Sequence, residues 1–144
     1  MFPVTLQHIL VPLDFSGPSD HALDVAVALA RPSGARLTLL HAVVPPVTWD
    51  GGFGVVDVVG AMAGDAQAKL SERVVRTGLS CEALVRVGAP VDAILACIEQ
   101  VAPDLVVMST HGRTGLTHAM LGSVAERVLQ RARCPVLVLP RHLS

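Results

Sequence analysis

Short apolar runs alternate with amphipathic segments along this chain, and this alternation limits the folds that it can adopt. Runs of strand length, each closed by turn-forming residues, cover residues 9–13, 36–44, 81–87, 104–108 and 135–140. The segments between them repeat apolar residues at helical spacing, over residues 20–31, 66–77, 91–101 and 122–133. Strands that alternate with helices favour a parallel sheet with right-handed crossovers and helices on both faces.

The composition indicates a core of small aliphatic side chains. Hydrophobic residues make up 51% of the chain but aromatic residues only 3%, so Val, Leu and Ala must fill the interior. That filling is typical of a parallel sheet covered by helices, which favours an α/β fold over an all-β sandwich. A chain of 144 residues can bury about 70% of its unfolded surface around one core. We therefore expect a single domain over residues 1–144.

Charge and cysteine content narrow the classes of function. The formal net charge of -1 offers no basis for a clustered basic surface, so nucleic acid is not an expected partner. No stretch approaches the roughly 18 uninterrupted apolar residues of a membrane span, so no membrane association is expected. Cys81, Cys97 and Cys134 form no CxxC pair. Their pattern argues against a disulfide framework or a zinc site and predicts a cytoplasmic protein.

Glycines interrupt the helical pattern between the second and third apolar runs. Gly51, Gly52, Gly54, Gly60 and Gly64 punctuate a segment that is otherwise apolar and nearly uncharged. Because no period is recognisable there, residues 47–64 are predicted to form a loop that passes into a helix near Val58.

A glycine-bearing turn follows the fourth apolar run. It extends from Ser109 through Gly112 and Gly115, and Gly122-Ser123 then begins the last helical segment. Such a turn can place backbone N–H groups around an anion, which predicts a phosphate cradle. It lacks the Lys-Ser/Thr ending of a P-loop and the spacing of a dinucleotide fingerprint, so both motifs are excluded. In this class of fold, ligands bind beyond the carboxyl ends of the strands, here at the turns after the first, second and fourth strands.

Several segments, in order and at their separations, resemble the universal stress protein (UspA) family along essentially the full length. They are VPLDFS at 11–16, GARLTLLH at 34–41, GAP at 88–90, DLVVM at 104–108, HGRTG at 111–115, LGSVAE at 121–126 and CPVLV at 134–138. The resemblance implies a doubly wound, Rossmann-like parallel sheet of strand order 3-2-1-4-5. It also implies a homodimer that pairs through the apolar edge strand Val136–Leu139, which would otherwise be an open pairing template.

One branch of this family binds ATP through a G-x2-G-x9-G-[ST] motif, so the resemblance implies ATP here. Gly112 matches the second glycine, and Gly122-Ser123 matches the third with its hydroxyl residue. Ser109 stands where the motif has its first glycine and adds a small side chain there. A side chain that narrowed the approach of the phosphates would instead favour a member of the family that does not depend on nucleotide.

The resemblance carries over an adenine-nucleotide site. Asp14 would lie at the adenine or ribose end, with Pro12 and Ala42 lining the base pocket, and the helix beginning at Ser123 would turn its positive end toward the phosphates. Mg²⁺ would accompany ATP, held by phosphate oxygens and water. The implied site comprises Pro12, Leu13, Asp14, Ala42, Met108, Ser109, His111, Gly112, Arg113, Gly122, Ser123 and Val124.

Some of these residues have a structural alternative. Asp14 would serve equally well as the N-cap of the first helix. Gly112 and Gly115 can simply permit a positive φ in a tight turn. Ser123 can cap the last helix, a role that is compatible with phosphate binding because both use the same helix end.

The histidines indicate neither a metal site nor a dedicated catalytic centre. His41, at the end of an apolar strand, is interpreted as a hydrogen-bonded core or dimer-facing histidine. His111 and His118 have no cysteine or carboxylate at ligand spacing, so no metal site is predicted. The turns contain no recognisable triad order, so no catalytic residue is assigned.

Three hypotheses about function follow. The leading one is a cytoplasmic, dimeric, ATP-binding regulatory module of the stress response, which at most hydrolyses ATP slowly. The second is a nucleotide-independent universal stress protein that acts as a dimeric interaction protein. The third is a nucleotide hydrolase or transferase, which would require steady turnover dependent on Asp14 or His111.

Overall fold

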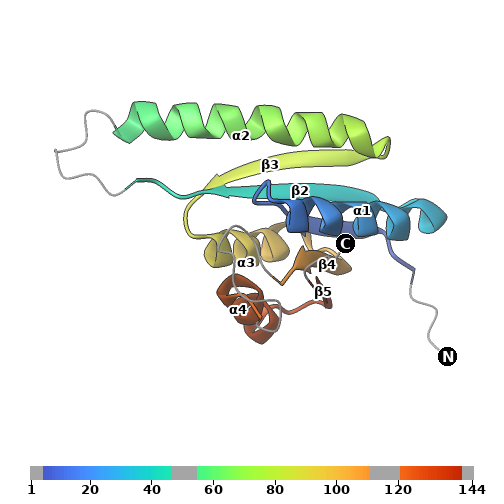
Figure 1. Cartoon of the computed structure of the whole chain (residues 1–144). Helices are drawn as coiled ribbons and strands as arrows, with labels where there is room; N and C mark the ends of the chain where they lie inside the picture. Colours follow the sequence, from blue (N-terminus) through green and yellow to red (C-terminus); the bar gives the residue numbers. More distant parts are fainter. Residues whose placement is uncertain (1–4, 47–54, 111–120, 141–144) are drawn as a thin grey trace.

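A computed structural model describes residues 5–46, 55–110 and 121–140, and it confirms the alternation of strands and helices (Figure 1). The elements are β1 (His8–Pro12), α1 (Gly17–Ser33), β2 (Arg36–Val43), α2 (Val55–Thr77), β3 (Cys81–Val87), α3 (Pro90–Val101), β4 (Leu105–Ser109), α4 (Ser123–Arg131) and β5 (Val136–Leu139).

The strands form one sheet in the order β3-β2-β1-β4-β5, and all neighbouring strands pair in parallel. The expected doubly wound sheet of order 3-2-1-4-5 is therefore confirmed. From β1 the chain moves outward through β2 to β3, then crosses back to β4 and on to β5. The strand order reverses between β1 and β4, which makes this pair the topological switch point of the fold.

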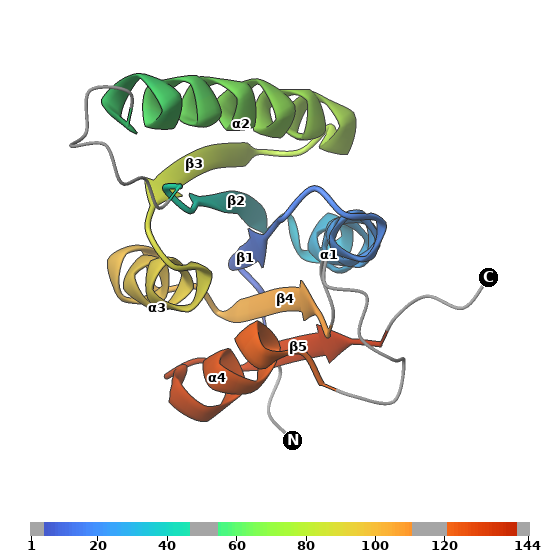
Figure 2. The same cartoon turned by 60° about the vertical axis from the view of Figure 1, so that its left-hand side comes forward.

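Helices α1 and α2 cover one face of the sheet, and α3 and α4 cover the other (Figure 2). Ile9 and Val11 of β1 pack in one cluster with residues of α1 and α2, including the fully buried Leu70. Leu10, between them in sequence, packs on the other face with residues of α3 and α4, including the fully buried Val128. This alternation explains why the central strands read as continuous apolar runs, because both of their faces are covered.

The first helix is longer than its apolar pattern indicates. The pattern predicted residues 20–31, whereas α1 covers Gly17–Ser33. The helix starts earlier because Ser16 is its N-cap and Pro18 fits the first turn, where no backbone N–H donor is needed. It ends at Gly34, whose φ of 68° lies in the left-handed region that favours glycine at a helix end.

The passage from loop to helix, predicted near Val58, is found within three residues of that position, but Gly60 and Gly64 lie inside the helix and do not interrupt it. Residues 47–54 lie outside the described residues, but α2 begins at Val55 and continues through Gly60 and Gly64. A glycine in a helix costs about 1 kcal/mol relative to alanine, which is less than the burial of one large apolar side chain contributes. Leu70, fully buried under the same helix, is such a side chain.

Glycine substitutions in the two helices should have opposite effects on stability. An added Cβ at Gly64 meets nothing within 4 Å, so Gly64→Ala should raise the free energy of unfolding by about 0.5–1 kcal/mol. Gly34→Ala meets no clash either, but its φ of +68° should make it destabilising by about 1 kcal/mol. Urea unfolding of both variants measures the difference, and a stabilised Gly34→Ala would contradict it.

A buried histidine joins the amino ends of β1 and β2. His8 is only 6% exposed, and its Nε2 lies 2.6 Å from Oγ1 of Thr38. Burial lowers the pKa of His8, and the positive charge of Arg36, whose Nη2 lies 3.4 Å from Nδ1, lowers it further. The folded protein therefore favours the neutral ring.

The titration of His8 should make the folded protein less stable in mild acid. The unfolded chain binds a proton at His8 more readily than the folded chain, so the free energy of unfolding should fall as the pH drops through the unfolded pKa of 6.5. His8→Gln removes this titration but keeps a group able to hydrogen-bond Thr38. Urea unfolding between about pH 7 and pH 5 should show a smaller loss of stability for His8→Gln than for the wild type. Equal losses would refute this role.

Candidate functional site

Pro12 ends the pairing of β1 with β4, at the point where the strand order reverses. The N–H of Leu13 donates to a β2 carbonyl, and the carbonyl of His8 accepts from the N–H before β4. In a parallel sheet, the backbone groups of successive residues point in turn to the two neighbouring strands. Those of Leu13 point to β2 and those of His8 to β4, so Pro12 lacks its N–H on the side that faces β4. Pairing of β1 with β2 accordingly continues to Pro12, whereas pairing with β4 stops at Leu10.

A pocket of about 270 Å³ lies where this pairing stops. The carboxyl ends of β1, β2 and β4 and the first turns of α3 and α4 contribute its walls. Its position at the switch point is the place where doubly wound folds bind ligands. Its size suits a small ligand rather than a macromolecular surface.

The structure brings most of the sequence-predicted site together in this one pocket. The lining includes Pro12, Leu13, Asp14, Ala42, Met108, Ser109, Gly122, Ser123 and Val124. The remaining predicted residues, His111, Gly112 and Arg113, lie outside the described residues. Residues that are far apart in the sequence therefore share one cavity because the carboxyl ends of parallel strands meet at one edge of the sheet.

Part of the lining was not singled out from the sequence. Leu40 and Ile94, together with Met108, form a nearly fully buried apolar wall. Ile94 arrives there because α3 connects β3, at one end of the sheet, to the central strand β4 and so crosses β2. The Gly88-Ala89-Pro90 turn marked the start of α3, but only the strand order shows where that helix goes. The other additions to the lining are Ser19, His41, Pro90, Thr110 and Ala125.

The start of α4 supplies backbone donors to the pocket. Gly122 is the N-cap, so the alternative that Ser123 caps this helix is wrong, and Ser123 is instead its first residue. The N–H of Gly122 donates to Thr110 O at 2.8 Å, and the N–H of Glu126 makes the first intrahelical bond at 2.9 Å. The N–H groups between them have no acceptor within the helix and carry its positive partial charge. This arrangement can bind an anion.

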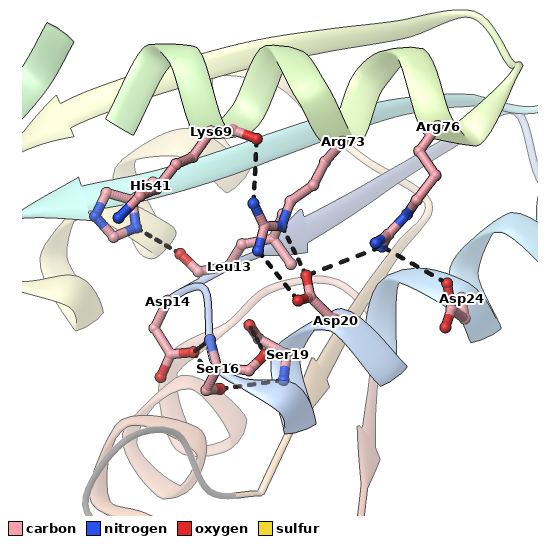
Figure 3. Close-up of polar contacts among 10 residues, drawn as sticks. All are labelled: Leu13, Asp14, Ser16, Ser19, Asp20, Asp24, His41, Lys69, Arg73 and Arg76. Carbon is pink, nitrogen blue, oxygen red and sulfur yellow. Dashed lines mark hydrogen bonds and ion pairs between the residues drawn. The ribbon is translucent and has the colours of Figure 1, made fainter. Parts of the chain in front are cut away.

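Asp14 does not cap α1 directly, so that alternative is also wrong (Figure 3). Its Oδ1 accepts hydrogen bonds from the N–H of Ser16, at 3.0 Å, and from the Ser16 hydroxyl. The Ser16 oxygen in turn accepts from the N–H of Ser19 at 3.3 Å and is the actual cap. Asp14 therefore supports the capping residue while its carboxylate lines the pocket.

His41 is hydrogen-bonded, as the structural interpretation of this residue predicted. Its Nδ1 lies 2.7 Å from the carbonyl oxygen of Leu13. Because a carbonyl can only accept, Nδ1 carries the proton of this bond. His41 thus ties β2 to the turn after β1 at the rim of the pocket.

Neither a metal-ligand cluster nor a membrane-spanning helix is found in the described part of the chain. Within it, no three His, Cys, Asp or Glu residues lie close enough together to hold a metal ion. The helices of residues 5–46, 55–110 and 121–140 are each too short or too polar to cross a membrane.

The reversed strand order and the pocket at the reversal define a Rossmann-like α/β protein. A sequence model described as the universal stress protein family matches residues 5–140. The chain belongs to the universal stress protein family.

Individual relatives agree with this assignment. Universal stress protein MJ0531 of Methanocaldococcus jannaschii is 32% identical over 140 residues, covering 94% of this chain and 82% of the relative. The structure of UspA from Lactobacillus plantarum has a TM-score of 0.85 at 24% identity and covers 95% of this chain and 99% of that chain, a likeness of fold. A universal stress protein solved in complex with cAMP has a TM-score of 0.71 at 28% identity, covering 98% of this chain and 100% of that chain.

Proposed function

We propose that this universal stress protein binds ATP in the pocket between β1 and β4. The observation that carries the proposal is the convergence of three strand ends and the start of α4 on one cavity. A 28% identical relative was solved with cAMP, which shares the adenosine part of ATP. The cavity and the start of α4 support a small ligand with an anionic group, and the relative supports adenosine as its other part.

The two ends of the pocket suggest how ATP would lie. Pro12, Ala42 and Met108 offer apolar surface for the base, and Asp14 offers a carboxylate to the ribose or adenine. The phosphates would then approach the N–H groups at the start of α4, next to Ser109. Mg²⁺ would be held by the phosphates and water, since no carboxylate cluster is needed for such a site.

The output we propose is a conformational or partner-binding change in the cytoplasm rather than a metabolic conversion. Among the described residues, the pocket lining supplies hydroxyls, backbone N–H groups, the His41 ring, whose Nδ1 already bonds to Leu13, and one carboxylate, Asp14, whose Oδ1 already accepts bonds from Ser16. A hydrolase would need a water or nucleophile positioned by a base. Bound Mg-ATP could still be hydrolysed slowly.

Calorimetric titration with Mg-ATP tests the proposal with Gly122 as the variable position. Aspartate is a favourable N-cap, so Gly122→Asp should keep α4 folded. Its negative charge at the phosphate end should nevertheless weaken ATP binding by about tenfold or more. Gly122→Ser is the matched control, because it offers a capping oxygen without the charge and should lose much less affinity.

The titration also separates the alternatives. No heat with the wild type, and no nucleotide bound to the purified protein, would favour the nucleotide-independent interaction protein. Equal affinity in Gly122→Asp would place the phosphates away from α4. Steady release of phosphate that is lost in Asp14→Asn would favour the hydrolase.

We further propose a homodimer formed through β5. In the described part of the sheet, β5 is the last strand on its side. The carbonyls of Pro135 and Leu139 accept bonds from the β4 side, so the backbone groups of Val136 and Val138 face the outer edge. Leu137, 36% exposed, adds apolar surface at this edge. An edge of this kind favours pairing with a second copy.

Removing one outward N–H should separate the proposed dimer. Val138→Pro deletes the N–H that faces the outer edge and leaves the bonds to β4 in place, so the protein should become monomeric. Val138→Ala is the control, because it loses similar packing against the core but keeps the N–H. Light scattering after gel filtration measures the mass of each variant. A dimeric Val138→Pro, or a monomeric wild type, would contradict pairing through β5.

A further inference from the structure

A cluster of side chains behind the pocket wall joins α2 to the turn that follows β1. Phe15 is at its centre, with its ring stacked on that of His41 at a centroid distance of 4.3 Å and an interplanar angle of 26°. The guanidinium carbon of Arg73, on α2, lies 4.7 Å from the Phe15 centroid on the same ring. We call Phe15, His41 and Arg73 the Phe15 cluster.

Arg73 is itself held in place on α1 and α2 (Figure 3). Its Nε and Nη2 donate to the two carboxylate oxygens of Asp20 at 2.7 and 3.1 Å, and its Nη1 donates to the carbonyl of Lys69 at 3.2 Å. Only 15% of the Arg73 side chain is exposed. A planar guanidinium fixed by a paired carboxylate presents a rigid face to an aromatic ring.

The turn that this cluster contacts has an unusual backbone. Phe15 has a φ of 65°, a left-handed conformation that a bulky residue adopts only when its surroundings hold it. The preceding residues, Leu13 and Asp14, line the pocket, and the carbonyl of Leu13 bonds to His41. Phe15 belongs to the same turn as Asp14. The contacts that hold the Phe15 ring therefore also help to set the position of the Asp14 carboxylate.

We propose that Arg73 is a positioning residue for the bound nucleotide, acting through Phe15 to fix Leu13 and Asp14 at the nucleoside end of the pocket. This inference rests on the proposed function. Arg73 lies outside the described lining of the pocket, so its effect passes through the Phe15 cluster. Because coupling between two sites is reciprocal, a bound nucleotide should in turn strengthen the attachment of α2 to the turn.

Calorimetry of Arg73→Met and Arg76→Met, both prepared as full-length protein, tests the inference. Arg76 is the matched control because it lies on the same helix and pairs with Asp20 and Asp24, at 4.0 and 3.8 Å, on α1. Arg73→Met should weaken Mg-ATP binding by roughly tenfold, and Arg76→Met should stay within about twofold of the wild type. Inorganic tripolyphosphate, which fills only the phosphate end, should bind all three proteins equally.

A second variant shows whether the effect passes through the ring. Phe15→Asn removes the ring but tolerates the left-handed backbone, so it should fold and should weaken ATP binding as Arg73→Met does. Adding Arg73→Met to Phe15→Asn should then cost no further affinity. Additive losses would overturn the inference, as would unchanged ATP binding in Arg73→Met or a parallel loss of tripolyphosphate binding.

Amide hydrogen exchange in the unliganded protein gives a readout that does not need nucleotide. Arg73→Met should speed exchange of the Ser16 N–H, which donates to Asp14, by roughly tenfold, and Arg76→Met should not. If the wild type binds no ATP, the proposed function fails, and this exchange rate still decides whether Arg73 positions the turn. An unchanged rate in Arg73→Met would overturn the inference.

Discussion

The pocket depends on one missing hydrogen-bond donor in the middle of the sheet. Pro12 faces β4 without an N–H, so β1 and β4 stop pairing at Leu10 while β1 and β2 continue. A proline is tolerated in a central strand only where the ladder ends. Here the ladder ends at the switch point, where α1 and α4 lie on opposite faces of the sheet. Beyond Leu10, a cavity lies between β1 and β4 where the sheet would otherwise continue.

Much of the fold could be predicted from the sequence because both faces of the sheet are covered. Strands such as Leu105–Ser109 then appear as uninterrupted apolar runs, and the helices between them as periodic ones. The strand order was implied by the resemblance to a family, because periodicity carries no information on which strands are neighbours. The start of α2 was predicted only to within three residues, since Gly60 and Gly64 oppose a helix locally whereas burial of Leu70 favours it.

For the candidate site too, the sequence could predict some residues but not others. Residues at strand ends, such as Asp14, Ala42 and Ser109, could be assigned to one place because parallel strands share a carboxyl edge. Ile94 could not, because its contribution depends on the path of α3 across the sheet. Arg73 gave no signal in the sequence, since a surface arginine on a helix is common and only the tertiary structure places it over Phe15.

The two ends of the pocket rest on different parts of the structure. In the proposed binding mode, the phosphate end is formed largely by backbone groups at the start of α4, whose inner side chains pack on the face that α3 covers. The proposed nucleoside end is formed by the turn after β1, which α1 and α2 hold from the opposite face through Asp20 and Arg73. A ligand that contacts both ends would link helices on opposite faces of the sheet. Occupancy of the pocket would then reach α2 through the turn after β1, because Arg73 and Lys69 of that helix both lie over the Phe15 ring.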